Sequence, residues 1–355
     1  MPTSHDHHHR PAPAGDHHGH RAAQHAHDDG QAQVLDLDAE VLSEHITAVA
    51  AWLPVRTPPT EIVDLGAGTG AGSFALLRQF PGIHLTAVDA SAAHLEQLRA
   101  TADAVGLSDR VDTVQADLDA SDWPDLGAPD LVWASASLHH LADPDQALRR
   151  IRDDLAPGGL VAVVELAGLP RFLPATAPED SPGLEERCHA ALQQRQAEHM
   201  PHRGADWGPK LTAAGFTLVE KLVLDVEVKG ADHDAVGRYA LAVLQGLRRA
   251  ASDALPADDL TALDRLIDTA GSHSILHRQD LVARTTRIVW AARPASDNAT
   301  VTTTAAPEPA EADGPNEWFS AAAEAANCER VLGNRRHGLD TLLVDERGAT
   351  TNLLT

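Results

Sequence analysis

The stretch EIVDLGAGTG, residues 61–70, decides the fold that we expect for this chain. Its first half has the apolar pattern of a buried strand, and its glycines lead into the helical pattern of residues 73–80. Glycine lets a backbone turn sharply and approach a ligand closely, and open α/β sheets bind ligands at the carboxyl ends of their strands. The stretch therefore predicts a strand, a ligand-binding loop and a helix, in that order.

The alternation of strand and helix continues beyond this loop. Helical patterns over residues 92–105 and 144–154 accompany four further strand-like runs, which are HLTAVDA (84–90), VDTVQADL (111–118), DLVWASAS (130–137) and GLVAVVEL (159–166). Strands that alternate with helices are joined by right-handed crossovers, so they form a parallel sheet that is covered on both faces. We expect an α/β fold: a Rossmann-like, mostly parallel seven-stranded sheet with helices on both faces and a helical lid.

The segments on either side of this core complete the expected domain. Apolar residues at helical spacing predict one helix from Leu35 to Leu53, which packs on the core. Two strand-like runs, at 216–228 and 285–292, follow later in the chain. Helical insertions precede and separate these runs, over residues 168–215, with helices at 184–199 and 209–214, and over residues 230–283, with helices at 234–250 and 258–270. The insertion between the two late strands is interpreted as a lid.

Composition divides the chain into four parts. Residues 1–33 carry nine histidines among Pro, Gly, Asp and Ala, which predicts a disordered leader, more typical of a solvated tail than of a metal site with fixed geometry. Residues 34–294 form the predicted domain, with a cofactor core over 60–167. Residues 295–313 have the composition of a linker. The tail, 314–355, has a helical stretch and a predicted hairpin but no role that its sequence indicates.

Charge and cysteine content exclude several classes of function. The formal net charge of −24 would repel the phosphates of a nucleic acid, so a small-molecule partner is favoured. Two cysteines, Cys188 and Cys328, are too few for a disulfide framework or a thiolate zinc site, which is typical of a cytoplasmic protein. The sequence predicts neither a membrane span nor a signal peptide, and the chemistry that we expect requires no metal.

Three acidic residues lie at the ends of the predicted strands: Asp64 at the mouth of the loop, Asp89 ending the second strand and Asp117 ending the third. Asp64 stands two residues before the first glycine, where it would repel a dinucleotide pyrophosphate and attract a cationic ligand. Asp89 is placed to accept hydrogen bonds from both hydroxyls of a ribose, and Asp117 to accept one from an adenine amino group beside Leu118. The glycine loop also satisfies the loose pattern of nicotinamide dinucleotide proteins, so an NAD-dependent oxidoreductase remains an alternative.

The motifs VDLGAGTG, AVDAS, QADL, DLVWASASLHHLADP and LAPGGLVAVVEL occur in order, and together they resemble class I S-adenosylmethionine-dependent methyltransferases. The resemblance covers residues 35–294 and is strongest over 61–166. The LHHL stretch is similar to small-molecule methyltransferases of the ubiquinone and menaquinone type, and the region from Asp206 to Arg293 is similar to an actinobacterial branch. The resemblance implies S-adenosylmethionine as cofactor, bound by Asp64, Gly66, Ala67, Gly68, Gly70, Asp89, Ala90, Asp117, Leu118 and Ser135.

Candidate catalytic residues follow the fourth and fifth strands. His139 and His140 lie at the rim where an acceptor would bind, and histidine suits proton removal near neutral pH. Glu165 ends the fifth strand and could contact the same acceptor. For Arg238 and Tyr239, in the predicted lid, we favour helix packing over a role in orienting the acceptor, and for Trp207 a packing role beside Pro209.

The function expected from these observations is transfer of a methyl group to an O, N or C atom of a small-molecule acceptor. Besides the oxidoreductase, a non-catalytic binding protein that retains the fold remains an alternative. The sequence does not indicate the acceptor or the oligomeric state.

Overall fold

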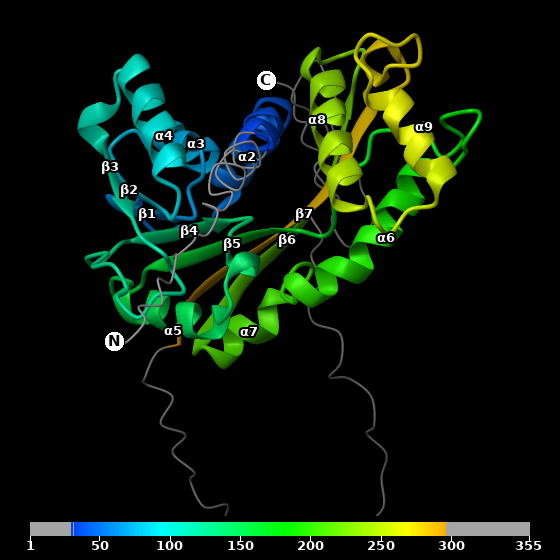
Figure 1. Ribbon diagram of the computed structural model, residues 1–355. Coiled ribbons are helices and arrows are strands. Elements are labelled where there is room, and N and C mark those ends of the chain that lie inside the picture. Colours follow the sequence, from blue (N-terminus) through cyan, green and yellow to red (C-terminus); the bar gives the residue numbers. More distant parts are fainter. Residues whose placement is uncertain (1–29, 31, 296–355) are drawn as a thin grey trace, which may run out of the picture. The chain divides into compact units, whose positions relative to one another are not determined.

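A computed structural model describes residue 30 and residues 32–295, and its centre is one seven-stranded sheet (Figure 1). The strand order is β3-β2-β1-β4-β5-β7-β6, in which all pairs are parallel except the two that β7 forms with β5 and β6. The strands are β1 (Glu61–Leu65), β2 (His84–Asp89), β3 (Val111–Gln115), β4 (Leu131–Ser135), β5 (Leu160–Leu166), β6 (Phe216–Lys229) and β7 (Val282–Pro294). The predicted mostly parallel seven-stranded α/β sheet is confirmed.

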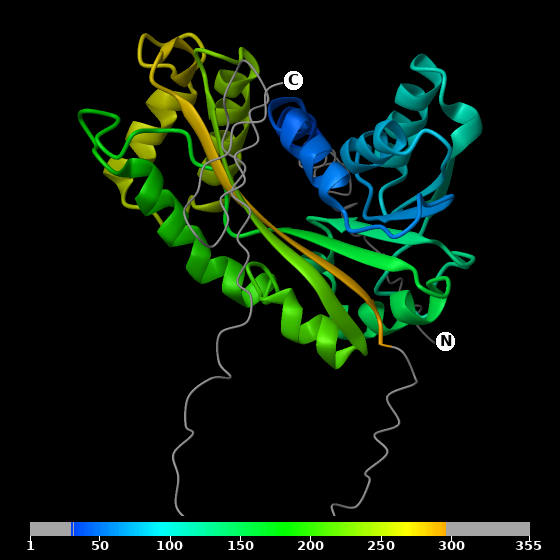
Figure 2. The same cartoon turned by 180° about the vertical axis from the view of Figure 1, so that it is seen from behind.

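Helices cover both faces of the sheet, and the alternation of side chains along each strand explains why. Ile62 packs into a core cluster with α2 (Ser43–Trp52), α3 (Ala71–Gln79) and α4 (Ala92–Ala104), whereas its neighbour Val63 packs into a second cluster. That second cluster contains α5 (Pro144–Asp154) and α7 (Trp207–Ala213), which lie on the opposite side of the strands in Figures 1 and 2. Strands buried on both faces are typical of parallel sheets.

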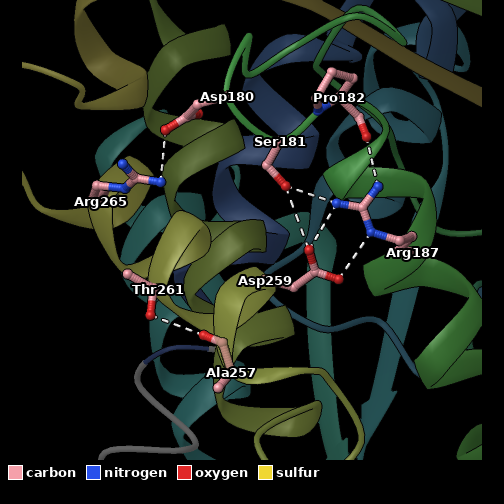
Figure 3. A network of polar contacts seen from close by, with 8 residues as sticks. All are labelled: Asp180, Ser181, Pro182, Arg187, Ala257, Asp259, Thr261 and Arg265. Carbon is pink, nitrogen blue, oxygen red and sulfur yellow. Dashed lines mark hydrogen bonds and ion pairs between the residues drawn. The ribbon is translucent and has the colours of Figure 1, made fainter.

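Three further helices gather around β6 and β7, the longest strands. They are α6 (Leu184–His199), α8 (Ala235–Ala250) and α9 (Ala257–Ile267), and all three contribute to the first core cluster. α6 and α9 are joined by a polar network that Figure 3 shows, in which the guanidinium of Arg187 donates to both oxygens of Asp259 at 2.9 and 2.7 Å. A second ion pair, of Arg265 with Asp180, ties α9 to the segment before α6.

The structure differs from the sequence prediction in two elements near the glycine loop. The single helix expected from Leu35 to Leu53 is two helices, over residues 32–41 and α2, with a turn at the buried Leu42. The third strand ends at Gln115, because the chain turns at Asp117, whose carboxylate accepts a hydrogen bond from the backbone N–H of Asp119 at 3.0 Å. Asp117 therefore follows the strand instead of ending it.

The remaining helices agree with their patterns to within a few residues. α7 begins at Trp207, with Asp206 as its N-cap and Pro209 in its first turn, and Trp207 is completely buried, as expected for a packing role. In the described part of the chain, no helix has the length and apolar character needed to cross a membrane. Nearly all of the predicted leader, nearly all of the linker and the whole tail lie outside the described residues, and residues 32 and 33 of the leader begin a helix.

Candidate functional site

The glycine loop is held against the end of β2 by backbone hydrogen bonds. The N–H groups of Gly66 and Ala67 both donate to the carbonyl oxygen of Val88, at 2.8 and 3.0 Å. The next donor, the N–H of Gly68, binds the Oδ2 atom of Asp89 at 2.8 Å. The loop therefore has a fixed path from β1 across the tip of β2 before α3 begins, at the edge where parallel sheets bind ligands.

Two glycines in this loop have no room for a side chain. Gly66 has a φ of 71°, and a Cβ atom there would lie 2.3 Å from the Cβ atom of Ser137. Gly70 has a φ of 98°, and its Cβ would lie 2.8 Å from the ring of Phe74. Both positions combine a left-handed backbone with close packing, which only glycine tolerates.

Asp89 is the best-connected acid at this edge. Besides Gly68, its carboxylate accepts from the backbone N–H of Ser91 at 2.8 Å and lies 3.3 Å from Nδ1 of His94. Burial by itself would raise the pKa of Asp89, but the hydrogen bonds from His94, Ser91 and Gly68 outweigh it and hold the pKa below its ordinary value. Asp89 is therefore ionised at neutral pH, and its Oδ2 atom, which accepts only from Gly68 among the described residues, still has capacity to accept from a ligand.

Asp64 lies deeper than the sequence suggested. Its side chain is 2% exposed, and its Oδ2 atom accepts a hydrogen bond from the hydroxyl of Ser73 at 2.7 Å. Burial, only partly offset by Ser73 and reinforced by the charge of Asp89, raises the pKa of Asp64 to about 7. Asp64 thus lies beneath the loop instead of at an open mouth, and its raised pKa lets it hold a proton much more readily than an exposed acid does.

The other predicted cofactor residues lie at neighbouring strand ends. Asp117 and Leu118 follow β3, which pairs with β2 so that Gln115 is opposite Asp89. Ala90 follows β2, and Ser135 ends β4 next to β1. The structure therefore brings all ten predicted cofactor residues to one edge of the sheet, although Asp117 is exposed and contacts neither of the other two acids.

His139 and Glu165 form a buried pair between the ends of β4 and β5. Nδ1 of His139 lies 2.6 Å from Oε2 of Glu165, and both side chains are at most 3% exposed. Because a carboxylate only accepts, Nδ1 carries the proton and donates it. Nε2 of His139 is also buried and has no hydrogen-bond partner among the residues that the structure describes. This pair fixes the short helical turn Leu138–His140 that follows β4.

His140 stacks on this pair from the outer side. The ring centroids of His139 and His140 are 4.1 Å apart, and His140 itself is exposed. Partial burial of the ring, together with the charges of His139 and Arg203, lowers the pKa of His140 to about 4. At neutral pH His140 is therefore uncharged and can accept a proton only as a weak base.

A cavity of about 890 Å³ opens beside these residues, at the same edge of the sheet. Its walls come from the segment after β5 (167–169), the segment after α6 (200–204) and the facing parts of β6 (225–227) and β7 (284–286). It contains no residue of the glycine loop. The edge thus has two adjacent regions, the loop with its acids over β1 and β2 and the cavity beyond β5.

The helix over residues 32–41 contacts the glycine loop, α4, α8 and β7. The side chain of Leu35 would lie 3.5 Å from a Cβ atom at Gly68, and Asp36 accepts two hydrogen bonds from Gln97 of α4. Asp38 accepts from the phenol of Tyr239 and pairs with Arg287 at 2.7 Å. Arg238 likewise pairs with Glu40 at 2.9 Å, so both α8 residues that the sequence placed in the lid are engaged in packing.

Several residues of this site carried no recognisable signal in the sequence. Ser73, His94 and Ser137 each fix an acid or the loop, with the hydroxyl of Ser137 donating to the carbonyl of Leu65 at 2.7 Å. Arg203, in the segment after α6, acts on His140 only through space. No group of three or more His, Cys, Asp or Glu side chains that could hold a metal ion occurs in the described residues.

Comparison with known proteins identifies the central region. Residues 63–161 match the family model of the methyltransferase domain. The trans-aconitate 2-methyltransferase of Acidovorax sp. (strain JS42) is 40% identical over 123 residues, which are 34% of this chain and 45% of that protein. The malonyl-[acyl-carrier protein] O-methyltransferase of Halorhodospira halophila is 29% identical over 194 residues, 52% of this chain and 62% of that protein. The chain thus spans less than half the length of the first of these relatives.

Among solved structures, an S-adenosylmethionine-dependent methyltransferase from Geobacter sulfurreducens in complex with S-adenosyl-L-homocysteine is 19% identical, with a TM-score of 0.38. That match covers 71% of this chain and 90% of the other. The strand order of this chain is 3-2-1-4-5-7-6, with an antiparallel seventh strand. Residues 63–161, which match the methyltransferase domain, lie within this sheet and carry the glycine loop with its buried and ionised acids.

Proposed function

We propose that this protein is an S-adenosylmethionine-dependent methyltransferase that acts on an O, N or C atom of a small-molecule acceptor. The observation that carries the proposal is Asp89, an ionised acid at the tip of β2 that is hydrogen-bonded to the glycine loop at Gly68. The family match over residues 63–161 supports it. The formal net charge of −24 favours a small molecule over a nucleic acid as partner, and we propose a cytoplasmic location.

The proposed cofactor residues fit the chemical groups of S-adenosylmethionine. Asp89 would accept from the ribose hydroxyls, and the loop would allow close approach of the cofactor, since Gly66 and Gly70 leave no side chain in the way. Asp64 would favour the cationic amino-acid end through its charge, and Asp117 and Leu118 would contact the adenine. Ala67, Gly68, Ala90 and Ser135 would line the remaining walls.

The bound cofactor supplies an activated methyl group, so the chain's main task is to position the acceptor and exclude water. The buried pair of His139 and Glu165 holds the turn after β4 in one conformation. His140, stacked on this pair, is the group that can receive a proton from the acceptor. Because its pKa is about 4, His140 suits acceptors that already have a free lone pair better than unactivated alcohols.

The relatives support a small-molecule acceptor. The names of the two relatives compared above mention trans-aconitate and a malonyl group on a carrier protein. An NAD-dependent oxidoreductase fits less well, because Asp64 beneath the loop would oppose a pyrophosphate when ionised. The third alternative, a non-catalytic binding protein, differs in having no turnover. The protein can be incubated with labelled methyl donor and a cell extract, and labelled products can be identified by mass spectrometry. This experiment distinguishes the methyltransferase from the oxidoreductase and from the binding protein.

Calorimetric titration with S-adenosylhomocysteine tests the cofactor site directly. We expect the wild-type protein to bind, and Asp89→Asn to bind about 10-fold to 100-fold more weakly, because hydrogen bonds to a charged group contribute about 1.5–3 kcal/mol. Asp109→Asn is the matched control, since Asp109 is an exposed acid on the short turn before β3 and should bind as the wild type does. Equal affinity of Asp89→Asn and wild type would refute the assigned role of Asp89, and no binding by the wild type would refute the function.

A further inference from the structure

The cavity beyond β5 is placed where an acceptor would be needed. β5 and β6 both run parallel to the central strands and β7 runs opposite to them, so the end of β6 and the start of β7 lie at the edge that carries the glycine loop. The cavity is lined by residues from these ends. Its volume of about 890 Å³ falls within the range of about 300–1,000 Å³ that is typical of small-molecule sites.

Three of the residues that line the cavity have buried polar atoms without a hydrogen-bond partner in the described part of the chain. They are Nε2 of His189, Nε of Arg203 and Oγ1 of Thr285. Buried polar groups in native proteins are nearly always hydrogen-bonded, and an unpaired group calls for a ligand or water. Because the three groups come from α6, the segment after it and β7, only the tertiary fold brings them together. They mark the cavity as a site for a polar ligand.

The charge of that ligand follows from the arginines around the cavity. Arg171 pairs with Glu186, and Arg284 donates to the carbonyl of Leu173. Arg203 differs, since its Nε atom is buried without a hydrogen-bond partner among the residues that the structure describes. The nearby acid Glu165 is hydrogen-bonded to His139 and acts on Arg203 only through space. Arginines stay protonated at neutral pH, so Arg203, together with Arg284, whose bond is to a neutral carbonyl, makes this part of the cavity positive.

Two acids also line the cavity and limit the charge of the ligand. Asp225 accepts a hydrogen bond from the hydroxyl of Thr286 at 2.6 Å, and both Asp225 and Glu227 are exposed on β6. Water screens exposed charges, so they weaken the attraction of an anion only in part. Burial lowers the pKa of His189 to about 4, which leaves it neutral and able to donate or accept one hydrogen bond. Two guanidinium groups without an acid partner in the described residues, Arg203 and Arg284, face two exposed and screened acids, which suits a monoanionic group better than a dianion.

We propose that this cavity binds the methyl acceptor and that the acceptor is a small carboxylic acid, one carboxylate of which is held by the guanidinium of Arg203. Carboxylate matches the planar donor pair of arginine, which can bind both oxygens at once. His189 and Thr285 supply neutral hydrogen bonds to the same ligand. The inference rests on the proposed function, because it identifies the second substrate of that site.

The test uses the full-length protein saturated with S-adenosylhomocysteine, titrated calorimetrically with acetate, succinate and tricarballylate. The amides of these acids are neutral controls of the same shape, and inorganic phosphate is the alternative anion. We expect saturable binding of at least one carboxylate, no binding of its amide and weaker binding of phosphate. Arg203→Gln should weaken carboxylate binding about tenfold or more, and Arg203→Lys less, because lysine keeps the charge but loses the planar pair of donors.

Two controls separate the possible results. Arg149→Gln removes an exposed arginine of α5 and should bind the carboxylate as the wild type does. All variants should retain wild-type affinity for S-adenosylhomocysteine, which shows that they are folded. If Arg203→Gln loses affinity for S-adenosylhomocysteine, Thr285→Val replaces it in the test. Thr285→Val removes only one unpartnered hydroxyl and should weaken carboxylate binding.

The outcomes distinguish this inference from the function on which it rests. If the wild type binds S-adenosylhomocysteine but no carboxylate, or binds phosphate more tightly, the carboxylate site is wrong and the methyltransferase function stands. The inference is also overturned if Arg203→Gln binds the carboxylate with the same affinity as the wild type. If the wild type does not bind S-adenosylhomocysteine, the proposed function itself fails.

Discussion

Two acids beside the glycine loop, Asp64 and Asp89, show how environment changes the behaviour of one side-chain type. Asp89 accepts from the backbone N–H groups of two residues and stays ionised, whereas Asp64 is fully buried, with donors from Ser73 alone among the described residues, and has a pKa of about 7. The sequence places both at strand tips and cannot tell them apart. The difference arises first from the deeper burial of Asp64 and then from the donors that the fold directs at each carboxylate.

The raised pKa of Asp64 predicts a pH dependence of stability. The native state keeps a proton that the unfolded chain, with a pKa of 3.8, releases, so the stabilisation is fully present below pH 3.8 and is lost as the pH rises to about 7. Asp64→Asn is neutral throughout and lacks this loss. We expect the Tm of Asp64→Asn minus that of the wild type to increase over this pH window. The same difference in Tm between Asp109→Asn and the wild type should not change with pH. If the difference for Asp64→Asn did not change with pH either, the assigned pKa would be contradicted.

At the scale of elements, the attachment of α6 to α9 depends on a few polar side chains. The Arg187 side chain also donates to the carbonyl of Pro182 and the hydroxyl of Ser181, so four acceptor atoms surround one guanidinium (Figure 3). The Asp259 side chain is 9% exposed, and the charge-assisted bonds from Arg187 hold its pKa below the ordinary value. Because α6 carries His189 of the cavity, this network helps to place the cavity wall.

A double-mutant cycle measures how much this network contributes. We expect Arg187→Gln and Asp259→Asn to be coupled by about 1 kcal/mol, at the low end for charged hydrogen bonds because Arg187 is 44% exposed and water screens it. The pair of Arg265 and Asp180, 48% and 52% exposed, is the internal control and should show almost no coupling. Urea unfolding of each variant provides the free energies. Equal coupling in the two pairs would show that burial of Asp259 does not matter.

At the scale of the whole molecule, both core clusters and every proposed site residue lie between residues 34 and 295. The described part of the chain therefore contains what cofactor binding requires. We expect a variant that ends at residue 295 to bind S-adenosylhomocysteine with wild-type affinity and to unfold at a similar temperature. Reduced affinity would mean that residues 296–355 contribute to the site, and loss of a partner without loss of affinity would favour a docking role for them.

The sequence alone determined the elements and the place of the cofactor loop. Periodicity and glycine spacing are local properties, so strands, helices and the acids at strand tips could be predicted from neighbouring residues. Even there, the break at Leu42 and the early end of β3 escaped prediction, because tertiary packing and a side-chain turn decided them. Only the tertiary structure joined Ser73 to Asp64, Glu165 to His139 and Arg203 to the cavity. These contacts link residues far apart in the chain, and burial, which sets their charge and partners, is a property of the folded molecule rather than of any segment.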